Sequence, residues 1–125
     1  VADFKPEIYI KEKIKKNENK SLNLNLKKNE DILEFLSKNN LQRPKLVIGF
    51  SAETKNILKL SKEKKERKHC DWIISNDISD NSIGFDSDYN SVSIIYKNNK
   101  IEKIAKNTKS FIAKTISRKI IDNFI

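Results

Sequence analysis

The chain has 125 residues, of which 37% are hydrophobic, so it can bury one modest core and we expect a single domain or most of one. Its apolar runs are too short to cross a bilayer and we expect no secretory leader, so the predicted location is the cytoplasm, with no membrane partner. The 26 Lys and Arg residues against 17 Asp and Glu give a net charge of +9, which favours an anionic partner such as a nucleotide, a nucleic acid or a phosphorylated metabolite.

The first third of the chain predicts one strand and one helix. Residues 21–28 alternate leucine with asparagine, the period of a strand that has one buried and one wet face. We expect this strand at a sheet edge or at a subunit contact. Residues 29–38 place apolar side chains at helical spacing, namely Ile32, Leu33, Phe35 and Leu36.

The central third predicts two buried strands around a helix. Residues 45–50 and 72–75 are short, nearly continuous apolar runs, which are typical of strands covered by helices on both faces. Residues 54–68 form a helical pattern that Thr54 could cap. These elements together indicate an α/β fold with a three-layer sheet.

The last third predicts a hairpin followed by a helix. Residues 92–96 and 100–105 read as two strands joined around Asn98 and Asn99. A helix is expected over residues 108–124, with a stripe that docks on the sheet and consists of Ile116, Ile120, Ile121 and Phe124.

Two lysines of the helix predicted over residues 54–68 occupy unusual positions. Its apolar face is defined by Ile57, Leu58 and Leu60, and Lys64 and Lys68 fall near the middle of that face. They could cover apolar surface while their ammonium groups reach solvent. The interpretation that we prefer is a clamp for a triphosphate, because two ammonium groups at i and i+4 point in the same direction.

Other polar positions allow a functional or a structural interpretation. Asn76 and Asp77 end a predicted strand, where ligands of open α/β sheets gather. Asp86 and Asp88 could hold hydrated magnesium or could simply form a turn, so the metal ligands stay undefined. The chain has one histidine, His69, and one cysteine, so we expect neither a zinc site nor a classical catalytic triad.

Several sequence motifs, taken in order, resemble one enzyme family. They are "VADFKP", "KIKK", "KKNEDIL", "KLVIGFSAET", "SNDIS" and "IGFDSDYNS". The family is phosphopantothenate–cysteine ligase, the synthetase part of the coenzyme A biosynthetic flavoprotein. The resemblance implies a Rossmann-like sheet with helices on both faces, of which residues 1–125 would be a single partial domain, the C-terminal portion of the synthetase domain.

The same resemblance implies that part of the family's protein lies outside this chain. The family has a glycine-rich first half, whereas Gly49 and Gly84 are the only glycines here. In many bacteria it also has a flavin-dependent decarboxylase domain, so we expect no flavin in this fragment. The sheet would then have an exposed edge, and the fragment alone would be inactive.

The resemblance also assigns roles to individual residues. Lys13, the first lysine of "KIKK", would be catalytic and would help to activate the phosphopantothenate carboxylate. The residues that it implies for nucleotide binding are Asp3, Asn29, Glu30, Asp31, Ile32, Leu33, Phe50, Lys64 and Lys68. Glu30 stands where the family has proline, which puts the local loop geometry in question.

The function implied is the ligation of 4′-phosphopantothenate with cysteine, driven by CTP through an acyl-cytidylate, with Mg²⁺ accompanying the nucleotide and a homodimer as the working state. The alternative is a non-catalytic basic module that binds nucleic acid, motivated by the charge of +9. Aromatic residues placed for stacking would support that alternative, but the aromatic positions, 8% of the chain, lie mostly in apolar strands and helices. We therefore expect no nucleic-acid partner.

Overall fold

The computed structural model describes residues 2–13, 23–38, 41–79 and 87–124. Within these ranges the strands form a two-stranded ribbon, β1–β2, and a four-stranded sheet of order β3-β4-β5-β6. Three helices accompany them. The elements are β1 (Phe4–Pro6), β2 (Leu26–Lys28), α1 (Ile32–Lys38), β3 (Ile48–Glu53), α2 (Ile57–Lys68), β4 (Trp72–Asp77), β5 (Tyr89–Ile95), β6 (Ile101–Thr108) and α3 (Lys109–Phe124).

The four-stranded sheet is mixed. β3 pairs with β4 in parallel, and α2 makes the crossover between them. β4 pairs with β5, and β5 with β6, in antiparallel fashion. In the part of the chain that the structure describes, β3 is therefore an edge strand whose outer side has no neighbouring strand. An exposed sheet edge was predicted from the sequence.

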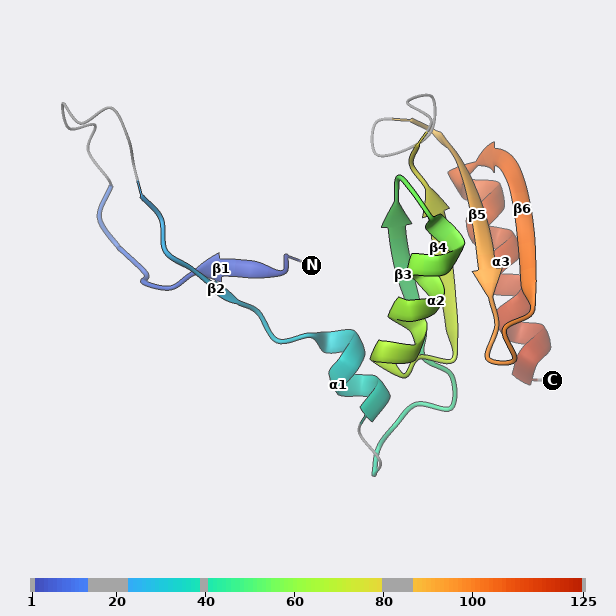
Figure 1. Ribbon diagram of the computed structural model, residues 1–125, viewed down its shortest axis with the longest axis horizontal. Coiled ribbons are helices and arrows are strands. Elements are labelled where there is room, and N and C mark those ends of the chain that lie inside the picture. The colour runs from blue at the N-terminus through green and yellow to red at the C-terminus, as the bar shows by residue number, and fades with distance from the viewer. Residues whose placement is uncertain (1, 14–22, 39–40, 80–86, 125) are drawn as a thin grey trace.

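Helices cover both faces of this sheet, so the predicted three-layer α/β fold is confirmed (Figure 1). On the α3 side, Trp72 and Ile74 of β4 pack with Ile112 of α3. On the other side, Ile73 packs with Cys70, and α1 and α2 cover this layer. Alternate residues of β4 point to opposite layers and both sets are buried, which explains the continuous apolar run of this strand.

The hairpin turn and the last helix form where the sequence predicts them. Asn99 has a φ of 63°, and Tyr96 N–H donates to the Lys100 carbonyl at 2.9 Å, which closes the turn between β5 and β6. Asparagine tolerates this left-handed conformation better than most residues do. At the start of α3, Phe111 N–H donates to Thr108 Oγ1 at 3.2 Å, so Thr108 caps the helix.

Several predicted element boundaries are wrong. α1 begins at Ile32 rather than at residue 29, β5 begins at Tyr89 rather than at residue 92, and β6 ends at Thr108 rather than at residue 105.

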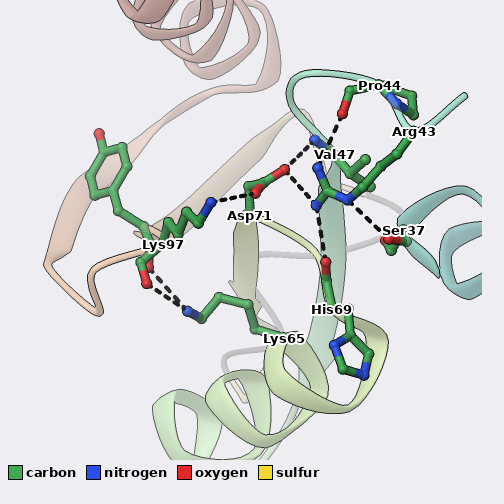
Figure 2. Close-up of polar contacts among 9 residues, drawn as sticks. Ser37, Arg43, Pro44, Val47, Lys65, His69, Asp71 and Lys97 are labelled. Carbon is green, nitrogen blue, oxygen red and sulfur yellow. Dashed lines mark hydrogen bonds and ion pairs between the residues drawn. The ribbon is translucent and has the colours of Figure 1, made fainter. Parts of the chain in front are cut away.

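β3 begins at Ile48 rather than at Lys45. Just before it, Val47 N–H donates to the Asp71 carboxylate at 2.9 Å (Figure 2), and the Val47 carbonyl accepts the Asp71 N–H at 2.8 Å. α2 begins at Ile57, and Asn56, with a φ of 48°, takes the capping position predicted for Thr54 without a side-chain hydrogen bond.

The buried face of α2 also differs from the prediction. Leu58 and Leu60 are 41% and 38% exposed, whereas Ser61 and Lys65 are buried. Ser61 Oγ donates to Ser75 Oγ at 2.7 Å, and Lys65 Nζ donates to the backbone carbonyl of Tyr96 at 3.2 Å. Polar groups with good partners thus replace leucine against the sheet.

The predicted docking stripe of α3 is right only for its first part. Ile116 and Ile120 pack on the core together with Ile112. Ile121 and Phe124 are 53% and 55% exposed. At about 100° per residue, Ile121 turns away from the face that carries Ile112, Ile116 and Ile120.

The ribbon of β1 and β2 extends away from the four-stranded sheet (Figure 1). Its pairing is antiparallel, from Phe4 opposite Lys28 to Pro6 opposite Leu26. The prediction for residues 21–28 is only partly right, since just Leu26–Lys28 is a strand, residues 21 and 22 lie outside the described ranges, and Leu26 is 56% exposed. We call residues 2–13 and 23–28 the arm. Among the helices described, none combines the length and apolarity needed to span a membrane.

Candidate functional site

A cavity of about 640 Å³ lies between the start of the arm, α1, α2 and the free edge of β3. All of the predicted nucleotide-binding residues line it: Asp3, Asn29, Glu30, Asp31, Ile32, Leu33, Phe50, Lys64 and Lys68. The other lining residues are Ala2, Phe4, Lys28, Ile48, Gly49 and Arg67. Residues from four separate segments of the chain, 2–4, 28–33, 48–50 and 64–68, thus surround one cavity.

The local sequence explains how α1 forms a wall of this cavity. Asp31 caps the helix, because its carboxylate accepts the Glu34 N–H at 2.9 Å and its carbonyl accepts the Phe35 N–H at 2.9 Å. The helix packs closely on β3 at a glycine. A Cβ at Gly49 would lie 2.8 Å from Leu33 Cδ2 and 3.2 Å from Cys70 Sγ. Only glycine allows α1 to approach this near.

Lys68 makes the principal ionic contact of the cavity. Its ammonium group donates to Glu34 at 2.9 Å and to Asp31 at a still shorter distance, and its side chain is only 11% exposed. The hydrogen bond with Asp31, followed by that with Glu34, raises the pKa of Lys68. The bond from Lys68 lowers the pKa of Asp31, and the bonds from Lys38 and then Lys68 lower the pKa of Glu34 to about 2. Lys68 is therefore held by carboxylates rather than simply reaching solvent.

Two further cations face the cavity from α2. Within the described ranges, neither Lys64 nor Arg67 has a carboxylate at ion-pair distance. Lys64 is the member of the predicted clamp whose charge is available to a ligand. Sequence reasoning missed Arg67, although its position three residues after Lys64 places it on the same side of the helix.

Asn29 follows β2 directly and is hydrogen-bonded to the start of the arm. Its backbone N–H donates to the Asp3 carbonyl at 2.8 Å, and its side-chain amide donates to the Ala2 carbonyl at 2.8 Å. Asp3 and Glu30 are exposed at the rim. A magnesium ion that arrives on a triphosphate needs only one or two protein carboxylates, and the lining of the cavity contains carboxylates. No cluster of three or more metal-ligating side chains exists within the described ranges.

Phe50 lies at the free edge of β3 and is 57% exposed, so it does not simply fill the core formed by the residues described. It also lines a second cavity of about 340 Å³, which opens between the sheet and α3 and is bordered by Ile74, Val92, Ile112 and Ile116. Phe50 thus borders both cavities at the edge of the sheet.

The remaining candidate residues are not brought into the first cavity. Lys13 is exposed and does not line it, and the rest of "KIKK" lies outside the described residues. Asn76 accepts a hydrogen bond from Asn90 at 3.3 Å, and Asp77 accepts the Ser79 N–H at 3.0 Å, as in a turn. Asp88 is exposed, and Asp86 also lies outside the described ranges.

Comparison with known proteins places the chain in a family. The family described as "DFP: DNA/pantothenate metabolism flavoprotein C-terminal domain" matches residues 1–124. A relative from Borreliella burgdorferi, "Coenzyme A biosynthesis bifunctional protein CoaBC", is 41% identical over 93% of this chain and 28% of its own length. The protein of the same name from Haemophilus influenzae is 32% identical over 99% of this chain and 30% of its own length.

A solved structure agrees with these matches. The crystal structure of the C-terminal domain of CoaBC has a TM-score of 0.69 and 25% identity, and covers 96% of this chain and 48% of that chain. This chain spans about a third or less of the curated relatives that it matches. The predicted resemblance is confirmed, and the chain belongs to the family of the DNA/pantothenate metabolism flavoprotein C-terminal domain, as the C-terminal synthetase portion of a CoaBC-like protein.

Proposed function

We propose that this chain supplies the nucleotide-binding part of a ligase in coenzyme A biosynthesis, which joins 4′-phosphopantothenate to cysteine with CTP. The observation that carries this proposal is the cavity in which the predicted nucleotide-binding residues meet. The names of the matched relatives, which refer to coenzyme A biosynthesis, support the same assignment.

In the proposed reaction, the phosphopantothenate carboxylate attacks the α-phosphate of CTP, which yields an acyl-cytidylate and pyrophosphate. The cysteine amine then displaces CMP. Lys64 and Lys68, with Arg67 beside them, hold the phosphates, and Asp3 and residues 29–33 recognise the nucleoside. A magnesium ion bound with CTP would neutralise phosphate charge.

A phosphate would compete with the two carboxylates that Lys68 already contacts. Without nucleotide, its ammonium group is occupied by Asp31 and Glu34. A phosphate oxygen is also a charge-assisted acceptor, so it can replace one carboxylate at little net cost while a second carboxylate keeps the lysine oriented. Lys64 has no such competition among the residues described, so it should make the first phosphate contact.

Nucleotide titration by calorimetry tests the clamp. CTP should bind more tightly than CMP, and Lys64→Ala should remove much of the difference, since each charge-assisted contact contributes about 1.5–3 kcal/mol. Lys64 is the preferred single change because it leaves the Lys68 ion pairs intact. The double variant K64A/K68A should abolish the difference. Lys59→Ala, which changes an exposed lysine of α2 outside the cavity, is the matched control. Equal CTP binding by the double variant and the unchanged chain would refute the clamp.

Lys13 is proposed to stabilise the negative charge that develops during acyl-cytidylate formation. In the complete enzyme, Lys13→Gln should lower the rate of pyrophosphate release more than about tenfold and leave CTP affinity nearly unchanged. The same change at Lys15 or Lys16 is the control. We propose that the chain of 125 residues alone has no ligase turnover, because the family's other half would supply part of the site.

We also propose that the working state is a cytoplasmic homodimer and that the arm forms part of its contact. The arm carries several apolar side chains that are more than half exposed: Phe4, Ile8, Tyr9, Ile10, Leu24 and Leu26. Apolar surface gathered on one projecting segment is typical of a protein interface. No flavin is proposed for this chain, and a flavin-dependent decarboxylase domain is proposed as part of the whole protein.

The nucleic-acid alternative was set aside because the aromatic residues lie mostly in strands and helices. Phe35, Phe50 and Phe111 do lie in such elements, and they are at least half exposed there. What favours a nucleotide instead is the cavity and the family match. A steep, sequence-independent dependence of oligonucleotide binding on salt concentration would support the alternative.

A further inference from the structure

Arg43 connects three elements at the end of the sheet that lies away from the carboxyl ends of β3 and β4 (Figure 2). Its Nε donates to the Ser37 carbonyl at 2.9 Å, in the last turn of α1. Its Nη2 donates to the His69 carbonyl at 3.1 Å, just after α2, and to the Asp71 carboxylate at 2.9 Å, just before β4. A planar guanidinium can serve several acceptors at fixed angles, which an ammonium group cannot.

Asp71 gives this contact a buried anchor. Its side chain is only 8% exposed, and besides Arg43 it accepts the Val47 N–H at 2.9 Å. Lys97 is a second cation near the carboxylate, at 3.7 Å, but its side chain is 83% exposed. A buried carboxylate is stable only when paired and hydrogen-bonded, so Asp71 holds the guanidinium in one place.

Among the residues described, Arg43 provides a hydrogen bond that joins the C-terminal end of α1 to the sheet. The helix has seven residues, too few to be stable without tertiary contacts. Ile32 and Phe35 are 52% and 55% exposed, so much of its apolar surface is not packed. Its N-terminal part contacts β3 through Leu33, which lies close to Gly49. It contacts α2 through the carboxylates of Asp31 and Glu34, which bind Lys68.

We propose that Arg43 is a positioning residue for the nucleotide cavity. By holding the last turn of α1 against the buried Asp71, it sets the angle at which α1 crosses α2. That angle places Asp31 and residues 29–33 opposite the cations of α2. This role deepens the proposed function and rests on it, because CTP affinity is one of the two quantities that test it.

The test compares Arg43→Lys with Lys97→Met in the full chain. Arg43→Lys keeps the charge beside Asp71 but loses the fork that reaches Ser37 and His69. Lys97→Met removes the other cation beside Asp71 without touching α1. The readouts are CTP affinity by calorimetry and the pKa of the Asp31 carboxyl by NMR titration, which reports the contact between Asp31 and Lys68.

Arg43→Lys should weaken CTP binding at least about tenfold and raise the pKa of Asp31 toward its ordinary value. Lys97→Met should leave CTP affinity within about twofold and the pKa of Asp31 unchanged. A folded Arg43→Lys protein with CTP affinity and Asp31 pKa both unaltered overturns the proposal. Equal losses in the two variants also overturn it, since they would show that only charge at Asp71 matters.

If the unchanged chain binds no CTP, the proposed function fails, but the Asp31 titration still decides the role of Arg43. If Arg43→Lys does not fold, Asp71→Asn takes its place. This variant retains an acceptor for Val47 N–H and should raise the pKa of Asp31 by a smaller amount. No rise in folded Asp71→Asn would overturn the proposal.

Discussion

The four-stranded sheet and the arm use apolar side chains in opposite ways. In the sheet, Ile73, Ile74, Ile94 and Ile95 are 0% exposed between layers of helices. In the arm, Ile8 and Tyr9 are 69% and 84% exposed beside a ribbon of only two short strands. A two-stranded ribbon cannot bury a core of its own. The sheet can therefore be stable through its own contacts, whereas the apolar side chains of the arm need contacts from elsewhere.

The largest expected effect contrasts the same residue type in the two regions. Ile94→Ala should lower the free energy of unfolding by about 2–5 kcal/mol, because it leaves a cavity between β5 and α3. Ile8→Ala, which removes an exposed side chain, should change it by about 0.5 kcal/mol or less. Urea denaturation at a protein concentration that keeps the chain monomeric measures both. Equal losses would show that the arm belongs to the folded core.

A second prediction concerns α1, which lies between the two regions. Gly49→Ala should destabilise the protein by about 1–3 kcal/mol, because the added methyl group would press on Leu33 and Cys70 and force α1 outward. Leu33→Ala in the same chain should recover part of this loss, since Leu33 Cδ2 is the atom approached most closely. Thermal unfolding of the single and double variants measures the coupling. Fully additive losses would show that the two residues do not compete for space.

The third prediction addresses what covers the arm. If a second copy covers it, Ile10→Lys should weaken self-association at least about tenfold, or about 1.4 kcal/mol. Ile121→Lys is the matched control, because Ile121 is 53% exposed on α3 and Ile10 is 58% exposed on the arm. Sedimentation velocity over a range of concentrations measures both. An unchanged dimer in Ile10→Lys, or no dimer in the unchanged chain, would contradict the proposed contact.

The smallest effect is a dependence of the α1 attachment on pH. The folded pKa of Glu34 is lowered to about 2 from an ordinary value of 4.5, so its stabilising contribution is present above pH 4.5 and is lost as the pH falls toward 2. Asp31, whose pKa is also lowered, acts in the same direction. Both carboxylate side chains are partly exposed to water and salt, 32% for Asp31 and 34% for Glu34, so the change should be modest. Glu34→Gln should reduce this acid-induced loss, as followed by amide exchange in α1, while exchange in β4 serves as the control.

The candidate site was predictable to the extent that it rests on short motifs. The residues implied for nucleotide binding all line one cavity, although their roles are still predictions. Arg67 was missed because neither its residue type nor its motif separates it from the many solvated cations of α2. Arg43 was missed for a different reason: its partners Ser37, His69 and Asp71 come from three segments with no common pattern.

The sequence by itself determined the order of the central and C-terminal elements, the buried run of β4, the turn at Asn98 and Asn99, and the family. Those signals are local, because they depend on side-chain periodicity and turn residues a few positions apart. Only the tertiary structure decided the bond between Val47 and Asp71, which are 24 positions apart. It also decided the partners of Lys68, which lie 37 and 34 positions away. Contacts at such separation depend on how the layers pack, and periodicity along one helix cannot report that.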